Sequence, residues 1–343
     1  MNGHERIQVA LSGKWPDQVP VMLHGFRMAA AEAGVSMAEY RRDPQAIARC
    51  FIAAVEKYQY DGIVVDVDTA TLAGALGVPI DFPDDEPARC RAAKIESLAA
   101  VADLEPVEVG KYAGVQVWLE AVRLLKQHFA GEIYIRGHCD QCAFSLASVM
   151  RGPQQWLWDI ARPKNEPLAH KLLAYCHQAT QQFVKLMAEA GANMVSNGDS
   201  LAGPATISPR MYRQFAWPYE KQVAASAKKL GLPYALHICG DTGLILDDMI
   251  DTGANCLELD HKTDVKLVHK ALLNRAVMIG NIDPVGVLAS GSVAVVEEKT
   301  RELLDQFVDT GQFILSAGCA IPPGTPSENL HAMIRTARQF GQS

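Results

Sequence analysis

The stretch Leu236-His237-Ile238-Cys239-Gly240 ends one predicted β-strand, and Ser316-Ala317-Gly318-Cys319 ends another much later in the chain. Side chains two residues apart in a strand point the same way, so His237 and Cys239 present an imidazole and a thiolate from one face. A third ligand from Cys319 completes the three-residue set that is typical of a catalytic zinc ion. The two stretches together predict a zinc site where two strands end.

Working outward from these two strands, further short apolar runs alternate with longer amphipathic segments. The eight predicted strands are Val19 to Leu23, Gly62 to Val67, Glu132 to Ile135, Asn193 to Ser196, Pro233 to Leu236, Asn255 to Leu259, Ala276 to Ile279 and Phe313 to Ser316. The predicted helices include Pro44 to Lys57, Glu166 to Glu189, Pro209 to Leu230, Thr242 to Asp251, Asp264 to Leu273 and Val293 to Val308. Eight strands that alternate with helices predict an α/β fold of the (β/α)₈ TIM-barrel type.

Polar, chemically capable residues follow nearly every predicted strand. In chain order these are His24, Asp66 and Asp68, Arg136 and His138, Asn197 and Asp199, His237 and Cys239, Glu258 and Asp260, Asn281 and Asp283, and Ser316 and Cys319. Any strand has to leave the core through polar residues, which is the simpler explanation at each single position. In a barrel, however, the C-terminal ends of all the strands meet at one rim, where active sites are built.

The chain shows no linker, low-complexity tract or internal repeat, so we expect residues 1–343 to form one domain with an N-terminal helical extension. The stretch from Gly77 to Gln127 departs from the repeat, and residues 79–87 are acidic and rich in proline. We expect a long excursion over the barrel mouth, of which a lid and a plain surface insertion are alternative interpretations.

The composition excludes several classes of function. A net charge of −7 without a basic block is unlike a nucleic-acid-binding protein, and no apolar run is long enough to span a bilayer. The first residues lack the pattern of a secretion signal, so the sequence predicts a cytoplasmic protein. Eight scattered cysteines are unlike a secreted disulfide framework and are expected to be free, catalytic or metal-bound.

A second cluster, His138-Cys139-Asp140-Gln141-Cys142, competes for the role of metal or redox site. It has no second cysteine pair at zinc-ribbon spacing, and it lacks the context of a thioredoxin-like motif. The remaining four cysteines, Cys50, Cys90, Cys176 and Cys256, lie in helix or strand patterns and are expected to be small buried apolar residues.

Several motifs resemble the uroporphyrinogen decarboxylase superfamily, and within it the branch of cobamide-dependent methyltransferases, which includes methylcobamide:coenzyme M methyltransferases and related demethylases. The motifs are His237-Ile238-Cys239-Gly240, Gly280-Asn281-Ile282-Asp283-Pro284, the segments Asn197 to Pro204 and Ile207 to Tyr212, and the segment Leu315 to Pro326. The resemblance covers most of the chain and implies a (β/α)₈ barrel. It also implies that His237, Cys239 and Cys319 are the zinc ligands.

The resemblance further implies a zinc-dependent methyltransferase of one-carbon metabolism. Such an enzyme moves a methyl group between the cobalt of a corrinoid and a small methoxy, methylthio or methylamine compound, or a thiol acceptor. The chain lacks the Asp-x-His-x-x-Gly signature of a cobalamin-binding domain. The corrinoid, such as methylcobalamin, is therefore expected on a separate corrinoid-binding protein that docks over the rim.

Four further residues are candidates to orient the substrate or the ligand imidazole, or to hold the fourth zinc position at rest. They are Asp199, Asn197, Asp283 and Glu258. Each of them can equally be a side chain that caps a loop.

Two other functions fit parts of the sequence. A uroporphyrinogen decarboxylase would use Asp66 as its catalytic aspartate, but the expected arginine-rich segment Arg-Gln-Ala-Gly-Arg-Tyr is replaced by residues 19–28, which hold the single arginine Arg27. Each carboxylate of a tetrapyrrole has to be paired when it leaves water, so this difference disfavours that substrate. A zinc-binding scaffold or sensor on a barrel without catalysis is the third alternative.

Overall fold

A computed structural model describes residues 1–341 of the chain. Eight parallel strands form one sheet in the spatial order β1-β2-β5-β6-β7-β8-β9-β10. The strands are β1 (Met22–Leu23), β2 (Gly62–Val65), β5 (Tyr134–Gln141), β6 (Met194–Gly198), β7 (Tyr234–Ile238), β8 (Cys256–Leu259), β9 (Val277–Ile282) and β10 (Phe313–Ala317). All eight predicted strands are present, and each pairs in parallel with its neighbour.

The sheet closes on itself where β10 meets the chain around β1. Val21 forms a parallel bridge with Leu315. The backbone N–H of Leu315 donates to Pro20 O at 2.8 Å, and that of Ile321 donates to His24 O at 2.8 Å. The predicted (β/α)₈ barrel is confirmed.

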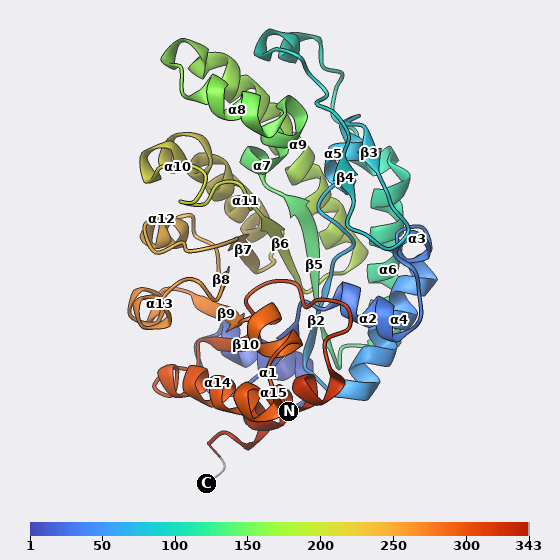
Figure 1. The fold of residues 1–343 in the computed structure, drawn as a ribbon, viewed down its shortest axis with the longest axis vertical. Helices are drawn as coiled ribbons and strands as arrows, with labels where there is room; N and C mark the ends of the chain where they lie inside the picture. The colour runs from blue at the N-terminus through green and yellow to red at the C-terminus, as the bar shows by residue number, and fades with distance from the viewer. Residues whose placement is uncertain (342–343) are drawn as a thin grey trace.

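Helices surround the barrel on its outer side (Figure 1). They are α1 (Gly3–Leu11), α2 (Phe26–Glu32), α3 (Met37–Tyr40), α4 (Pro44–Tyr58), α5 (Thr71–Ala75), α6 (Ala113–Phe129), α7 (Ala143–Arg151), α8 (Pro153–Ile160), α9 (Glu166–Ala190), α10 (Pro209–Phe215), α11 (Trp217–Lys229), α12 (Leu246–Asp251), α13 (Val265–Leu272), α14 (Val293–Gln306) and α15 (Ser327–Gln339). A π-helical turn spans Pro284–Ala289, and 3₁₀ turns span Leu98–Asp103, Val109–Lys111 and Pro163–Asn165. None of the helices within residues 1–341 is both long and apolar enough to cross a bilayer.

The helix expected from Pro209 to Leu230 is two helices, α10 and α11, which meet at Ala216. Pro218 lies in the first turn of α11, where a residue without a backbone N–H is tolerated. The same residue cannot continue a preceding helix, which explains the break.

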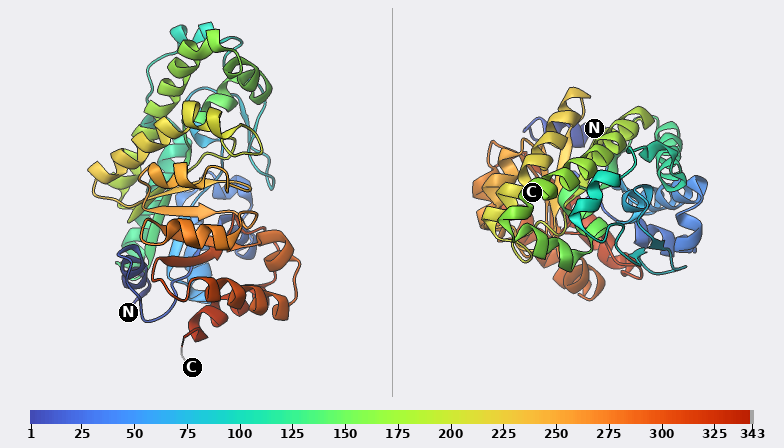
Figure 2. Two further views of the ribbon diagram at one scale, coloured as in Figure 1. Left: turned by 90° about the vertical axis from the view of Figure 1, so that its left-hand side faces the viewer. Right: turned by 90° about the horizontal axis from the view of Figure 1, so that it is seen from above.

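The N-terminal extension is α1, and it closes the bottom of the barrel. Its residues Ile7 and Ala10 pack into a buried layer to which every strand contributes at least one side chain. The strand residues of this layer are Met22, Val64, Tyr134, Met194, Ala235, Cys256, Val277, Ile279 and Ile314. Figure 2 shows the N-terminus, with α1, and the C-terminus at the same end of the molecule.

The strand period of two explains what lies above this layer. Two residues beyond it, the strands place polar side chains in the barrel interior. These are His24, Asp66, Arg136, Ser196, His237, Glu258 and Ser316, all of them buried. The barrel is therefore apolar at its N-terminal end and polar toward its C-terminal mouth, where the site is expected.

The stretch from Gly77 to Gln127 contains an ordinary barrel helix, α6, so the excursion is shorter than predicted. Its remainder holds a two-stranded antiparallel ribbon, β3 (Ile80–Asp81) with β4 (Arg89–Cys90), and two 3₁₀ turns. Lys94 N donates to Met150 O of α7 at 2.8 Å, and Gln182 Nε2 of α9 donates to Val107 O at 2.7 Å. The excursion is thus bound to the helices beside the mouth.

Asp61, the residue immediately before β2, binds the elements that close the barrel. Its carboxylate accepts from Val21 N at 2.8 Å and forms ion pairs with Arg6 of α1 at 3.0 Å and Arg338 of α15 at 2.8 Å. The side chain is 2% exposed, so its interactions are shielded from water.

We expect Asp61→Ala to lower the free energy of unfolding by about 2–4 kcal/mol, because it leaves a buried N–H and two arginines without their shared partner. Asp309→Ala is the control, since it removes an exposed ion pair with His269 that is worth about 1 kcal/mol or less. Urea unfolding followed by circular dichroism measures both. Equal midpoints for the two variants would contradict this role of Asp61.

Candidate metal centre at the barrel mouth

The structure brings His237, Cys239 and Cys319 together. One potential ligand atom from each residue lies within 4.8 Å of the others, and no other group of this kind was found among the described residues. His237 Nε2 is 3.2 Å from Cys239 Sγ. His237 is at the end of β7, Cys239 follows that strand, and Cys319 follows β10.

Cys319 reaches β7 from a strand that is not its neighbour, and Gly318 makes this possible. A Cβ at position 318 would lie 2.6 Å from the backbone N of His261, so only glycine lets the loop after β10 cross the loop after β8. Gly318 N also donates to Ile282 O of β9 at 2.9 Å. This close contact fixes the position of the neighbouring Cys319.

The orientation of the His237 ring is set by one hydrogen bond. Its Nδ1 lies 3.0 Å from the backbone carbonyl of Glu258 on β8. A carbonyl oxygen only accepts, so Nδ1 carries the proton and donates it. Nε2 is then the ring nitrogen that faces the sulfurs and would bind a metal once it is deprotonated, which is the arrangement that metal-binding histidines commonly have.

Further contacts hold the two cysteine loops. Ser200 Oγ lies 3.5 Å from Cys239 Sγ. Gly240 N, next in the chain, donates to Asp260 Oδ2 at 2.8 Å. The loops after β6, β7, β8 and β10 are therefore joined around the same three donor atoms.

Without a metal, Cys239 is a thiolate and Cys319 keeps its proton. The hydrogen bond from the Cys319 thiol, with that from His237, lowers the pKa of Cys239 far below its ordinary value. The same Cys239 sulfur raises the pKa of Cys319. Burial opposes a charged imidazole, but the hydrogen bond to Cys239 and its charge raise the pKa of His237 to about 9. The centre is thus an anionic sulfur beside a cation, from which a divalent metal ion would displace the protons.

One imidazole nitrogen and two sulfurs form a donor set that suits zinc. The Nδ1 proton of His237 is donated to Glu258 O, which leaves Nε2 as the ligand atom. The two sulfurs lie close enough to Nε2 for all three atoms to bind one ion. The residues therefore fit a zinc ion in a site with three protein ligands.

A buried charge network lies beneath the triad. Arg136 Nη2 is 2.6 Å from Glu258 Oε2, and both side chains are at most 1% exposed. His24 donates from Nε2 to Asp66 Oδ2 at 2.7 Å, and its Nδ1 is 3.7 Å from Glu258 Oε1. Burial opposes its charge, but the two carboxylates raise the pKa of His24 to about 9. The sequence predicts these residues at strand ends but does not indicate their pairing.

Glu258 is the one of the four orienting candidates that lies directly behind a donor residue. Its carboxylate is 3.8 Å from His237 Nδ1. Its Oε1 has no hydrogen-bond partner within the part of the chain that the structure describes. Interactions with Arg136 and His24 overcome burial and lower the pKa of Glu258, so the side chain is charged.

Asn197 and Asp199 are bound behind β6. Asn197 Nδ2 donates to Cys139 O of β5 at 2.6 Å. Asp199 accepts from Ser145 N of α7 at 2.7 Å, and burial raises the pKa of its carboxyl. Because Ser196 points into the barrel, its neighbour Asn197 points outward. These contacts position the loop that carries Ser200.

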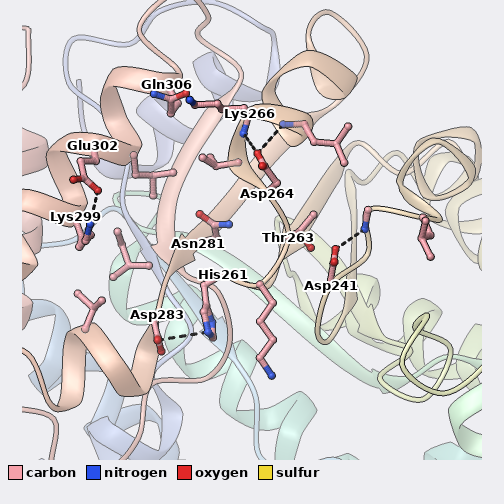
Figure 3. Close-up of a pocket in the computed structure, with 18 residues that line it drawn as sticks. Asp241, His261, Thr263, Asp264, Lys266, Asn281, Asp283, Lys299, Glu302 and Gln306 are labelled. Carbon is pink, nitrogen blue, oxygen red and sulfur yellow. Dashed lines mark hydrogen bonds and ion pairs between the residues drawn. The ribbon is translucent and has the colours of Figure 1, made fainter.

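Asp283 lies further out on the rim. Its Oδ1 accepts from the N–H groups of Val285 and Gly286, both at 2.9 Å, and thereby caps the π-helical turn. Its Oδ2 is 3.5 Å from His261 Nε2 (Figure 3).

Asp283 and His261 line a groove of about 850 Å³ beside the centre, between the loops after β7, β8 and β9 and helices α13 and α14. Figure 3 shows charged side chains such as Asp264, Lys299 and Glu302 along it, and apolar side chains lie between them. Asp241, two residues after Cys239, lies at its edge, but none of the three donor residues lines it.

The competing cluster of cysteines does not form a site. Cys139 and Cys142 are fully buried, and their sulfurs contact different partners, Gly137 O at 3.7 Å and Tyr234 OH at 3.5 Å. Burial raises the pKa of both thiols. Cys50, Cys176 and Cys256 are buried as expected, whereas Cys90 is exposed, because it lies on the β3–β4 ribbon outside the core.

Comparison with known proteins gives three kinds of match. A family model described as uroporphyrinogen decarboxylase (URO-D) matches residues 2–340. Methylcobamide:CoM methyltransferase MtbA of Methanosarcina mazei is 28% identical over 346 residues, which cover 98% of this chain and 97% of that protein. MtbA of Methanosarcina acetivorans is 33% identical over 222 residues, which cover 65% of this chain and 63% of that protein.

Relatives with the other activity also match. A protein named uroporphyrinogen decarboxylase, from Prochlorococcus marinus, is 26% identical over 316 residues, which cover 89% of this chain and 87% of that protein. Among solved structures, a methyltransferase from Methanosarcina mazei aligns with a TM-score of 0.90 and 24% identity over 99% of both chains. At 24% identity this structural match supports the fold alone.

In metal-free protein, we expect Cys239 to be alkylated by iodoacetamide before any other cysteine. It is partly exposed and its pKa is lowered, so its thiolate persists at neutral pH, whereas the exposed Cys90 has a raised pKa. Peptide mass spectrometry measures the rate at each site. Between about pH 6 and 8 the rate at Cys239 should stay nearly constant, while that at Cys90 should rise about tenfold per pH unit. A tenfold rise at Cys239 would contradict the assigned charge.

Proposed function

This chain belongs to the uroporphyrinogen decarboxylase family, and from that premise we propose that it is a zinc-dependent methyltransferase. It moves a methyl group between a small substrate and the cobalt of a corrinoid that a separate protein carries. The small substrate is a methoxy, methylthio or methylamine compound, or a thiol acceptor. The relatives named methylcobamide:CoM methyltransferases, which match nearly the whole chain, support this general kind of reaction.

The observation that carries the proposal is the convergence of His237, Cys239 and Cys319 within 4.8 Å at the mouth of a barrel. Three protein ligands leave one position of a tetrahedral ion for a substrate. A bound zinc ion would supply Lewis acidity there, which favours the thiolate form of a thiol near neutral pH and weakens the bond from a methyl group to a leaving group.

The residues around the ligands divide the remaining work. The backbone carbonyl of Glu258 holds His237 in the tautomer that presents Nε2 to a metal. The Glu258 carboxylate lies near the same ring, and Arg136 neutralises the charge of that carboxylate. Asn197 and Asp199 fix the loop that brings Ser200 to Cys239. Asp283 keeps the outer rim in place at the edge of the groove.

The barrel supplies orientation. Methyl transfer requires the nucleophile, the methyl carbon and the leaving group to lie nearly in line. A centre at the mouth, with a floor of paired charges beneath it, leaves one open direction from which a partner can approach. In the direction of the thiol, the net reaction forms a carbon–sulfur bond, breaks the methyl–cobalt bond and releases the proton of the thiol.

Decarboxylation of a tetrapyrrole is the alternative, since named uroporphyrinogen decarboxylases are among the relatives and Asp66 is buried in the barrel. Its carboxylate, however, is bonded to His24, and the guanidinium of Arg136 is bonded to Glu258. These cations are already neutralised and do not form a clamp for a polyanionic substrate.

We expect Cys239→Ser and Cys319→Ser to lose stoichiometric zinc and to lower methyl transfer by more than about 100-fold, since even residues behind a ligand commonly matter 10- to 100-fold. Cys90→Ser, on the exposed ribbon, is the control and should match the wild type in both measurements. Elemental analysis gives the zinc content, and the absorbance of free methylcobalamin follows the methyl group. Full activity of metal-free Cys319→Ser would contradict the proposal.

Incubation with uroporphyrinogen, followed by chromatography of the porphyrins, separates the two enzyme functions. The paired state of Arg136 and His24 predicts no decarboxylated product. Turnover without metal or partner would favour the decarboxylase. Stoichiometric zinc without methyl transfer to or from any of a panel of methylated compounds and thiols would favour a scaffold or sensor.

A further inference from the structure

A second cavity, of about 300 Å³, lies away from the metal centre and the groove, and shares no residue with either. It is bounded by α3 and the two residues after it, the turn between β2 and α5, residue Phe82 after β3, and the start of α6. The lining residues are Ala38, Arg41, Arg42, Asp68, Thr71, Phe82, Tyr112, Ala113, Gly114 and Val117. Its size is at the lower end of small-molecule sites.

Two buried polar side chains in its wall each have one atom without a hydrogen-bond partner among residues 1–341. Asp68 uses Oδ1 to accept from Ala70 N, Thr71 N and Thr71 Oγ1, but its Oδ2 has no hydrogen bond. Arg41 donates from Nη1 to Pro83 O, but its Nε has no hydrogen bond. The two free atoms are 4.0 Å apart, which is too far for a direct hydrogen bond. Both side chains are at least nine-tenths buried, so a ligand group that accepts from Arg41 Nε and donates to Asp68 Oδ2 would satisfy both atoms.

The cavity also presents positive groups to a ligand. Tyr112, the cap residue of the 17-residue helix α6, makes no side-chain hydrogen bond to its first turn, and Ala113 and Gly114 of that turn line the cavity. The free N–H groups and the dipole of such a helix end favour an anion. Arg42 forms no ion pair within the described residues, whereas Arg41 is matched by Asp68. A single negative charge on a ligand would balance the remaining positive charge of Arg42.

The other walls are apolar and in part aromatic. Phe82, Tyr112 and Val117 face the same space, and the Arg41 guanidinium lies 5.8 Å from the centroid of the Phe82 ring. Aromatic rings and a guanidinium plane favour a flat ligand body. A bare inorganic anion would leave these walls in contact with water.

We propose that this cavity binds a small aromatic carboxylate that carries a hydroxyl group. The carboxylate faces Arg42 and the first turn of α6, the ring lies among Phe82, Tyr112 and Val117, and the hydroxyl bridges Arg41 and Asp68. A divalent cation does not fit, because one carboxylate faces two arginines and a helix N-terminus.

The site connects the excursion to the barrel. Arg41 also holds the carbonyls of Pro83 and Glu86, and Tyr40 of α3 donates to the carbonyl of Asp66 at 3.0 Å. A ligand that joins Arg41, Phe82 and Asp68 therefore stabilises residues 79–90 against local opening. The proposal requires neither zinc nor methyl transfer.

The test uses the full-length protein with 2-, 3- and 4-hydroxybenzoate, and with benzoate and 4-hydroxybenzyl alcohol as probes that lack the hydroxyl or the charge. Isothermal titration calorimetry should show that one hydroxybenzoate binds at least about tenfold more tightly than benzoate and than 4-hydroxybenzyl alcohol. A factor of this size is expected for a hydrogen bond or ion pair to a charged group. Hydrogen exchange of residues 79–90 should slow when that compound is bound.

Two variants locate the binding. Arg42→Gln removes an exposed cation without an internal partner, and Ala38→Leu fills the cavity; each should weaken binding at least about tenfold with an unchanged melting temperature. Arg49→Gln, an exposed arginine of α4 outside the cavity, is the matched control. Cys319→Ser should bind as the wild type does, which separates this site from the metal centre.

Three results would overturn the proposal. The first is no binding of any hydroxybenzoate at about 10 mM. The second is binding that both cavity variants retain. The third is equal affinity for the neutral alcohol, which would show that the ring alone is recognised.

Discussion

The hydrogen bond from His237 Nδ1 to the backbone carbonyl of Glu258 is the constraint on which the centre depends. It joins β7 to its neighbour β8 and decides which ring nitrogen faces the sulfurs. Because the acceptor is part of the backbone, ring orientation follows from the pairing of two strands and is independent of any mobile side chain. Cys239 follows two residues later on the same face, and Gly318 lets Cys319 approach from β10.

The charges beneath the triad are self-contained. Asp66, His24, Glu258 and Arg136 alternate in sign across four strands, and each is in contact with at least one neighbour of opposite charge. A buried ion pair contributes little net stability, but the loss of one partner leaves the other without compensation. The network therefore keeps the barrel floor rigid and neutral.

The sequence predicted the barrel well because each strand is a short apolar run bounded by turn residues, and the strand period then places residues two apart on one face. This period alone brings His237 and Cys239 together. It could not show that Ser196 points inward and Asn197 outward, because strand register is decided by pairing with β5 and β7. Nor could it show the Arg136–Glu258 pair, whose members are 122 positions apart. The break at Ala216 was missed because the weight of Pro218 was not considered, and the exposed Cys90 was missed because a short strand pattern does not show whether the strand belongs to the barrel or to a surface ribbon.

X-ray absorption at the zinc edge tests the central claim most directly, since it reports the atoms that surround the ion. The account predicts two sulfur neighbours at about 2.3 Å and one or two nitrogen or oxygen neighbours at about 2.0–2.1 Å. A spectrum of the zinc-loaded protein without a sulfur shell, or with a single sulfur, would contradict it.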